Sequence, residues 1–153
     1  MFYNWVNDKE KLKDTLSLLR LNSPALWGRM DAQQMVEHLI ILFEISSKKQ
    51  QTNILTPEKY LEKSQAILMS DEPMPKNFVA KFLPIDPTPY LYSSLVEANS
   101  QLLFVLSAYQ VYWKERENER LNHPIFGSLT KDMWDRVHNK HIHHHFLQFG
   151  LIK

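Results

Sequence analysis

The prolines and glycines of this chain leave its long periodic segments almost uninterrupted, and their placement constrains the fold more than any other feature. The eight prolines occupy positions 24, 57, 73, 75, 84, 87, 89 and 124. The three glycines, at positions 28, 127 and 150, fall between or after segments of helical periodicity, where a chain must turn. No alternating apolar pattern of any length predicts a half-buried strand. The sequence therefore predicts an all-α fold.

The apolar periodicity predicts four long helices and one short helix. The long helices are expected at residues 8–21, 31–48, 89–120 and 130–150, and the short one at residues 57–69. Asp31 and Gln34 have the spacing of a capping box. Thr56 and Pro57 predict a cap followed by proline at the first helical position. We expect the charged run from Lys114 to Arg120 to be a solvated helix end.

The connections between these helices predict how they run. Short links join the first helix to the second and the third to the fourth, which favours antiparallel pairs. The long connection over residues 49–88 allows the second and third helices to run parallel. We therefore expect one domain over residues 1–153, a four-helix bundle of the up-down-down-up type with a long crossover between helices 2 and 3.

The proline-rich segment over residues 70–89 allows two interpretations. It carries three side chains of buried type: Phe78, Phe82 and Leu83. The segment is either a packed crossover or a lid over one end of the bundle. His123, which precedes Pro124, is expected in the loop that leads into the last helix.

The last predicted helix carries five of the seven histidines of the chain. At about 100° per residue, one face is shared by five residues: Trp134, His138, His141, His145 and Gln148. His143 points almost the opposite way, and His144 lies at the edge of the face. His141 and His145 are separated by four residues, and two imidazoles at that spacing can bind one metal ion from a single helix.

His38 lies on the apolar face of the second predicted helix. A single histidine in that position is commonly a core residue with its hydrogen bonds satisfied. However, His38 lies about 10 Å from the start of its helix, and the midpoint of His141 and His145 lies about 9 Å from the end of theirs, at 1.5 Å per residue. Antiparallel helices would bring the three to one level, whereas parallel helices would leave a mismatch of roughly 8 Å.

A site of three histidines favours catalysis over a purely structural role. Three neutral imidazoles leave at least one coordination position open. The chain has no cysteine, so a metal must be held by His, Asp or Glu, and an all-nitrogen set suits Zn, Ni, Cu or Fe(II) better than Mg or Ca. Such an ion would lower the pKa of a bound water or hold a thiolate. The alternative is a polar, solvent-facing helix end with adventitious metal affinity.

Composition and net charge narrow the classes of binding partner that we expect for this chain. The formal net charge is +1, which gives no electrostatic footprint for nucleic acid or an anionic membrane. The N-terminus lacks the pattern of a signal peptide. The apolar runs Leu39–Phe43 and Leu102–Leu106 are too short to span a bilayer. We expect a cytoplasmic protein without a nucleic-acid or membrane partner.

Several of these residues together resemble a known superfamily. The sequence Met35-Val-Glu-His38-Leu, with His141-Ile-His-His144-His145-Phe-Leu-Gln148, resembles the DinB-like superfamily of metal-binding four-helix bundles. Three further stretches resemble an uncharacterised branch of it, a domain of unknown function: Trp27-Gly-Arg-Met30, His123-Pro-Ile-Phe-Gly127, and Trp134 with Lys140 to Gly150. The resemblance covers nearly the whole chain.

The resemblance implies a ligand set and, less directly, a reaction. It implies that His38, His141 and His145 hold a divalent transition metal, zinc or nickel or else iron, and that His144 is not a ligand. Better-known relatives transfer low-molecular-weight thiols such as bacillithiol, mycothiol or glutathione, or use the thiol in isomerisation. Hydrolase activity rests on the same analogy of fold.

These observations support one leading hypothesis and two alternatives. The leading hypothesis is a metal-dependent enzyme, a thiol S-transferase or hydrolase for a small molecule, with Gln148, Trp134 and Gln34 as pocket or second-shell residues. No general base can be named. The first alternative is a non-catalytic, metal-stabilised helical bundle that binds a ligand or a protein. The second is a scaffold with structural histidines. Homodimerisation is left open.

Overall fold

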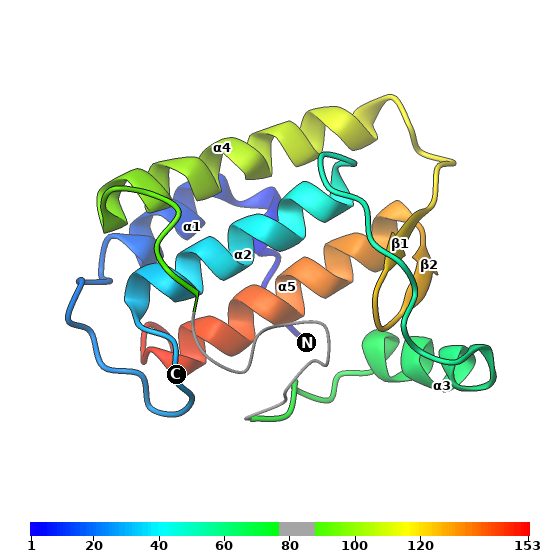
Figure 1. The fold of residues 1–153 in the computed structure, drawn as a ribbon, viewed down its shortest axis with the longest axis horizontal. Coiled ribbons are helices and arrows are strands. Elements are labelled where there is room, and N and C mark those ends of the chain that lie inside the picture. The colour runs from blue at the N-terminus through cyan, green and yellow to red at the C-terminus, as the bar shows by residue number, and fades with distance from the viewer. Residues whose placement is uncertain (77–87) are drawn as a thin grey trace.

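The computed structural model describes residues 1–76 and 88–153, which are mainly helical with one small sheet. The elements are a 3-10 helix at Trp5–Asn7, α1 at Lys9–Leu16, α2 at Ala32–Ser46, α3 at Glu58–Met69, α4 at Leu95–Lys114, β1 at Leu121–His123, β2 at Gly127–Leu129, and α5 at Lys131–Gln148. α2 packs against both α4 and α5. Figure 1 shows that α2 and α4 run in one direction and α5 in the opposite one.

The mainly helical character is as predicted, but the hairpin of β1 and β2 adds a small sheet that the all-α prediction did not include. The strands pair antiparallel, with Leu121 opposite Leu129 and His123 opposite Gly127. His123 is therefore a buried strand residue and not a loop residue. Its Nδ1 accepts hydrogen bonds from the backbone N–H groups of Ile125 (3.0 Å) and Phe126 (3.3 Å), and it thereby holds the turn. Sequence periodicity could not reveal a three-residue strand that depends on this side chain.

Two of the long helices are shorter than predicted. α1 ends at Leu16 instead of Leu21, and the Arg20 guanidinium donates to the carbonyls of Ser17 (2.6 Å) and Leu19 (3.2 Å) just beyond it. α4 begins at Leu95 instead of Pro89, because the Ser94 side chain caps it by accepting from the Glu97 N–H.

The charged run continues beyond the end of α4, since Lys114 is the last helical residue and residues 115–120 follow the helix. Glu119 lies beyond the helix, and its carboxylate accepts from the Tyr112 hydroxyl (2.6 Å) and pairs with Lys48 (3.3 Å). These contacts turn the chain towards β1. Residues 115–120 therefore form a connection that Glu119 ties to α4 through Tyr112 and to the turn after α2 through Lys48.

The caps of the other helices follow the sequence closely. The capping box of α2 is present, with both Asp31 and Gln34 in their expected roles. The Thr130 side chain accepts from the Met133 N–H at the start of α5. α3 starts one residue later than expected, since Pro57 occupies its N-cap position and not the first helical turn.

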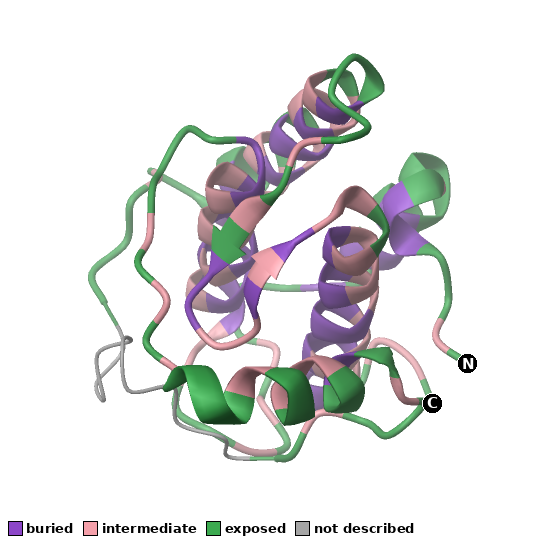
Figure 2. Ribbon diagram, turned by 90° about the vertical axis from the view of Figure 1, so that its right-hand side faces the viewer, coloured by how far each residue is buried: buried purple, intermediate pink, exposed green. Residues whose placement is uncertain are grey.

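One core joins the helices. Its largest fully buried side chains include Trp113, Trp134, Tyr109, Phe43 and Phe146. The buried positions line the inner faces of the helices, whereas α3 is mostly exposed (Figure 2). Among the described residues, no helix combines the length and the apolar character that a membrane crossing requires.

The two ends of the proline-rich segment are described, but its centre is not. Phe78, Phe82 and Leu83 lie outside the described residues, so the choice between a lid and a packed crossover stays a prediction. Before the undescribed residues, Lys140 and Arg136 of α5 donate to backbone carbonyls at the end of α3, between residues 67 and 70. On the far side, buried Glu37 accepts from the backbone N–H groups of Leu91 and Tyr92.

Candidate metal centre

Three histidine side chains from α2 and α5 meet at one point. The Nε2 atom of His141 lies 2.8 Å from the Nε2 of His38 and 3.0 Å from the Nε2 of His145. The three potential ligand atoms all lie within 4.8 Å of one another. His141 and His145 are one turn apart on α5, and the antiparallel course of α2 brings His38 to their level (Figure 1). The structure thus brings together the three histidines that sequence reasoning selected.

The proton of the His145 ring can be assigned from its neighbours. The side-chain Nε2 of Gln148 donates to the backbone oxygen of Trp27 at 2.8 Å, and a carbonyl can only accept. The other end of the amide, Oε1, therefore faces His145 Nδ1 at 2.7 Å. Because Oε1 is an acceptor, Nδ1 carries the hydrogen. The Nε2 of His145 then presents a lone pair to the cluster.

Protons alone cannot satisfy the three converging nitrogens. A hydrogen on His141 Nε2 would have to serve both His38 and His145, because a neutral imidazole carries only one N–H. Without that hydrogen, the lone pair of His141 would face the lone pair of His145 at 3.0 Å. A cation bound by three lone pairs would satisfy all three converging Nε2 atoms. The donor set therefore fits a metal ion.

The size of the cluster is also close to that of a metal site. Nitrogens bound to a tetrahedral zinc ion stand about 3.3 Å apart, given Zn–N bonds of about 2.0–2.1 Å. The observed contacts are a few tenths of an ångström shorter. A small movement of α2 relative to α5, or of the rings, would accommodate an ion.

Burial keeps the three imidazoles neutral. Desolvation lowers the pKa of His38 to about 4, and the positive charge of His144 adds to the effect. Desolvation, followed by the charges of neighbouring histidines, also holds the pKa values of His141 and His145 well below the usual range. Neutral histidines have their lone pairs available for a metal at neutral pH.

The remaining histidines of α5 have separate roles. The ring of His138 stacks on Phe43, with centroids 3.8 Å apart, and its Nε2 is 2.7 Å from the Ser46 hydroxyl. His138 shares the predicted face of α5 but belongs to the core and lies outside the cluster. His143 contacts Phe2 on another side of the helix. His144 packs edge-on between the ring of Trp27 and that of His145.

Gln148 and the two other predicted pocket residues differ in their contacts. Gln148 binds His145 directly, as described above. Trp134 lies about two turns before His141 on α5; it packs on His123 and His138 and donates to the carbonyl of Leu121. Gln34 uses its side chain for the capping box and for a hydrogen bond to the carbonyl of Thr88. Neither Trp134 nor Gln34 has a described hydrogen bond or ring contact with the three clustered histidines.

Sequence reasoning missed the contribution of the loop between α1 and α2. Helical periodicity predicts a turn at Gly28 and assigns no partner to the neighbouring Trp27. Both contact Gln148. The resemblance at Trp27-Gly-Arg-Met30 was the one signal that pointed to this loop.

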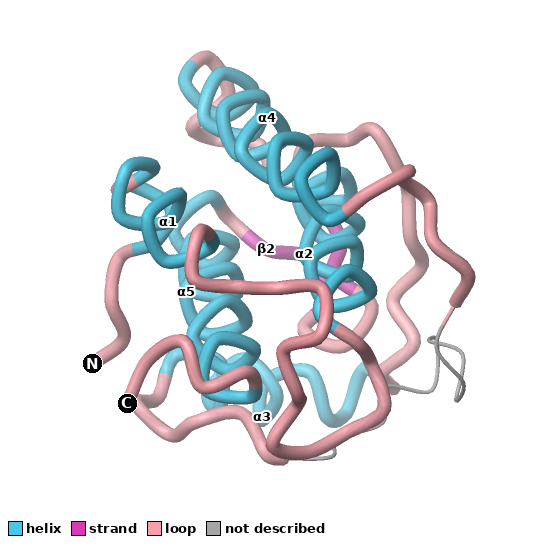
Figure 3. Tube along the Cα trace, turned by 90° about the vertical axis from the view of Figure 1, so that its left-hand side faces the viewer, coloured by secondary structure: helices cyan, strands magenta, loops and turns pink. Residues whose placement is uncertain are grey.

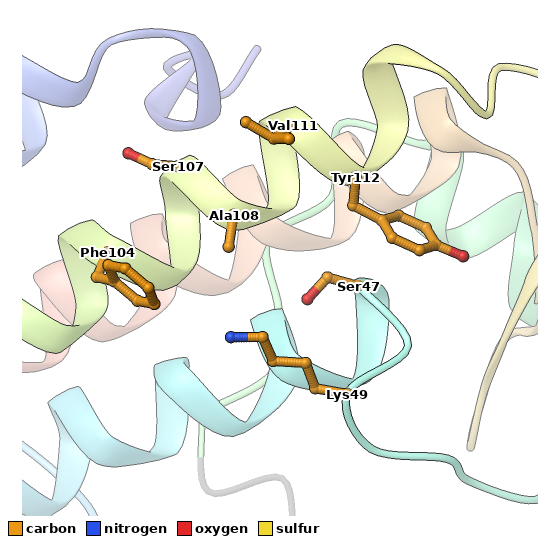
Figure 4. A pocket seen from close by; sticks show the side chains of 7 residues that line it. All are labelled: Ser47, Lys49, Phe104, Ser107, Ala108, Val111 and Tyr112. Atoms are coloured by element: carbon orange, nitrogen blue, oxygen red, sulfur yellow. The ribbon is translucent and has the colours of Figure 1, made fainter.

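Two depressions in the described part of the surface are lined by residues other than the clustered histidines. One is a shallow apolar groove between the end of α2 and α4, lined by Ser47, Lys49, Phe104, Ser107, Ala108, Val111 and Tyr112 (Figure 4). The other lies near Lys48 and Arg120. His141 and His145 are only 7% and 5% exposed, and His38 is half-buried. His38 therefore forms the most accessible side of the cluster.

Comparison with known proteins identifies one family over part of the chain. Residues 103–150 match a family described as "Protein of unknown function (DUF1569)". The match runs from the middle of α4 to the end of α5, so it includes His141 and His145 but not His38. No curated protein and no solved structure matches the chain. Nothing in these comparisons links it to the DinB-like superfamily.

Proposed function

We propose that this chain is a metal-dependent enzyme in which His38, His141 and His145 hold a divalent transition metal, zinc or nickel or else iron. The observation that carries the proposal is the convergence of three Nε2 atoms that protons cannot satisfy. When bound, such an ion would supply a Lewis acid that lowers the pKa of a water or holds a thiolate. Of the three residues that would hold it, His38 is the least buried.

The charge at the cluster favours an anionic ligand. Among the described residues, the group that could hold an ion consists of three histidines and contains no carboxylate. A dication held by neutral imidazoles keeps its full charge in a largely buried place, which is costly unless an anion accompanies it. A thiolate is such an anion. We therefore propose thiol S-transfer on a small molecule as the reaction, with hydrolysis as the second reaction of the same site.

The fold assignment belongs to the same proposal. α1, α2, α4 and α5 would be the four helices of a DinB-like bundle, and the hairpin and α3 would be additions to it. The topology of these helices supports this assignment, since α2 and α4 are parallel and α5 is antiparallel to both (Figure 1). The protein would act in the cytoplasm.

Cobalt substitution tests the reaction class. The protein is loaded with Co(II) and titrated with a small thiol such as cysteamine, with ethanolamine as the matched control that lacks sulfur. Thiol S-transfer predicts a thiolate-to-cobalt absorption band with cysteamine alone. No band from a series of small thiols would contradict the transferase reading, and metal-dependent cleavage of an activated ester would then test hydrolysis.

One observation favours a non-catalytic function as the second candidate. Two of the three rings of the histidine cluster are buried, and the two depressions described above are lined by other residues. A metal sealed in this way would stabilise a module that binds a ligand or a protein. Azide added to the cobalt-loaded protein separates the two candidates: a change in the cobalt spectrum requires an accessible coordination position, whereas a sealed site leaves it unchanged.

A further inference from the structure

The loop between α1 and α2 contacts the last residue of α5 through both its backbone and its side chain. The Leu26 N–H donates to the carbonyl of Gln148 at 2.8 Å. The Trp27 carbonyl accepts from the Gln148 side-chain nitrogen, also at 2.8 Å. Figure 3 looks at the end of the molecule where this loop and the end of α5 lie together. The loop therefore determines which end of the Gln148 amide faces His145.

Gly28 allows this approach for two reasons. Its φ of +82° is a conformation that residues with a Cβ rarely adopt. A Cβ on Gly28 would also lie 2.6 Å from the Gln148 side-chain nitrogen, which is closer than such atoms can approach. Any larger residue would push the amide away from Trp27, and the acceptor that faces His145 would move with it.

We infer that the loop from Leu26 to Gly28 sets the tautomer of His145, with Gln148 as the positioning residue and Gly28 as the residue that the arrangement requires. A hydrogen held on Nδ1 by Gln148 leaves the Nε2 lone pair aimed at the cluster. Without the Gln148 acceptor, neutral His145 would be a mixture of two tautomers, with the hydrogen on Nδ1 in one and on Nε2 in the other. This inference rests on the proposed function in one respect, which is that the Nε2 lone pair of His145 binds a metal ion.

Nuclear magnetic resonance of metal-free, ¹⁵N-labelled protein tests the tautomer directly, because the two tautomers of a neutral imidazole have distinct ¹⁵N chemical shifts. The variants are Gly28→Ala and Gln148→Met, which removes the acceptor at similar length. The matched control is Gly150→Ala, because Gly150 has a φ of +65° but nothing within 4 Å of an added Cβ. This control carries similar backbone strain without the collision.

The expected result is a His145 ring with its hydrogen on Nδ1 in wild type and Gly150→Ala, and a mixture of tautomers in both other variants. Gln148→Met keeps the test valid if Gly28→Ala does not fold. The inference is overturned if His145 keeps its hydrogen on Nδ1 in Gln148→Met, or if wild type lacks that tautomer.

Zinc affinity provides the second readout. Loss of an outer-shell partner typically weakens metal binding by about 10- to 100-fold, so Gly28→Ala and Gln148→Met should bind zinc that much more weakly than Gly150→Ala. Competition with a chromophoric chelator measures this. Equal affinity in all four proteins would overturn the inference while the metal site stands. If wild type binds no zinc, the proposed function fails, and the tautomer result is judged on its own.

Discussion

The Nε2 atoms of His38 and His141 lie 2.8 Å apart although 103 residues separate them in the sequence. This contact joins the histidine of α2 to the histidine pair of α5 and so completes the cluster. It depends on the antiparallel course of the two helices and on the matching depth of the residues along them.

Alanine at His38 should remove most of the zinc affinity, and alanine at His143 should change it little. His38 supplies one of three converging nitrogens, whereas the His143 ring packs on Phe2 away from the cluster. Zinc titration in competition with a chelator checks this. Equal losses in the two variants would mean that metal binding follows the number of histidines and not their geometry.

Zinc should stabilise the fold by mass action. An ion that binds only the folded chain adds about 2.7 kcal/mol to the free energy of unfolding at a concentration 100 times its Kd. Urea unfolding with zinc or with a chelator measures the difference. His141→Ala is the control and should show no response, since it lacks the central nitrogen of the cluster. A response of similar size in that variant would point to binding elsewhere.

His138→Ala should weaken the fold without removing the metal. The substitution leaves a cavity beside Phe43 and takes away one of the two hydrogen-bond partners of the buried Ser46 hydroxyl, which together should cost about 2–4 kcal/mol. Urea unfolding of the metal-free protein measures the loss, and zinc titration of the folded variant should give nearly the wild-type affinity. A variant of wild-type stability that has lost zinc would place His138 in the metal site instead.

The metal-free protein should lose stability as the pH falls below about 6.5, the usual histidine pKa in an unfolded chain. Burial lowers the pKa of His123 to about 3 and that of His138 well below its usual range. At a pH between the folded and the unfolded pKa of such a histidine, the unfolded chain binds a proton that the folded chain does not. Each buried histidine therefore lowers the free energy of unfolding by up to about 1.4 kcal/mol for each pH unit below about 6.5. Urea unfolding at pH 7.5, 6.5 and 5.5 measures the slope, and a constant free energy over that range would refute the buried neutral state.

The sequence was sufficient where a property depends on neighbours along one helix. The capping box of Asp31 and Gln34 and the cap at Thr130 are local, and both are present. The spacing of His141 and His145 likewise determines that they share a face. His38 could be placed at their level because depth along a helix follows from counting residues.

The sequence was insufficient where a distant segment decides the role of a side chain. Glu37 is buried because it accepts from backbone N–H groups 54 and 55 residues away, and no pattern within its own helix indicates those partners. His138 has the same helical face as His141, yet Ser46 and Phe43 of α2 assign it to the core. Helical periodicity specifies a face and cannot specify which partner covers it.

Elemental analysis of tag-free protein, purified without a nickel column, measures whether the three histidines hold a metal ion, with His141→Ala prepared in parallel. The account predicts about one equivalent of a transition metal in wild type and little in His141→Ala, which lacks the nitrogen that contacts both other histidines. Absence of metal from both proteins, even after reconstitution with Zn, Ni, Fe(II) and Cu, would contradict it. The histidine cluster would then be a structural feature of a helical interaction domain.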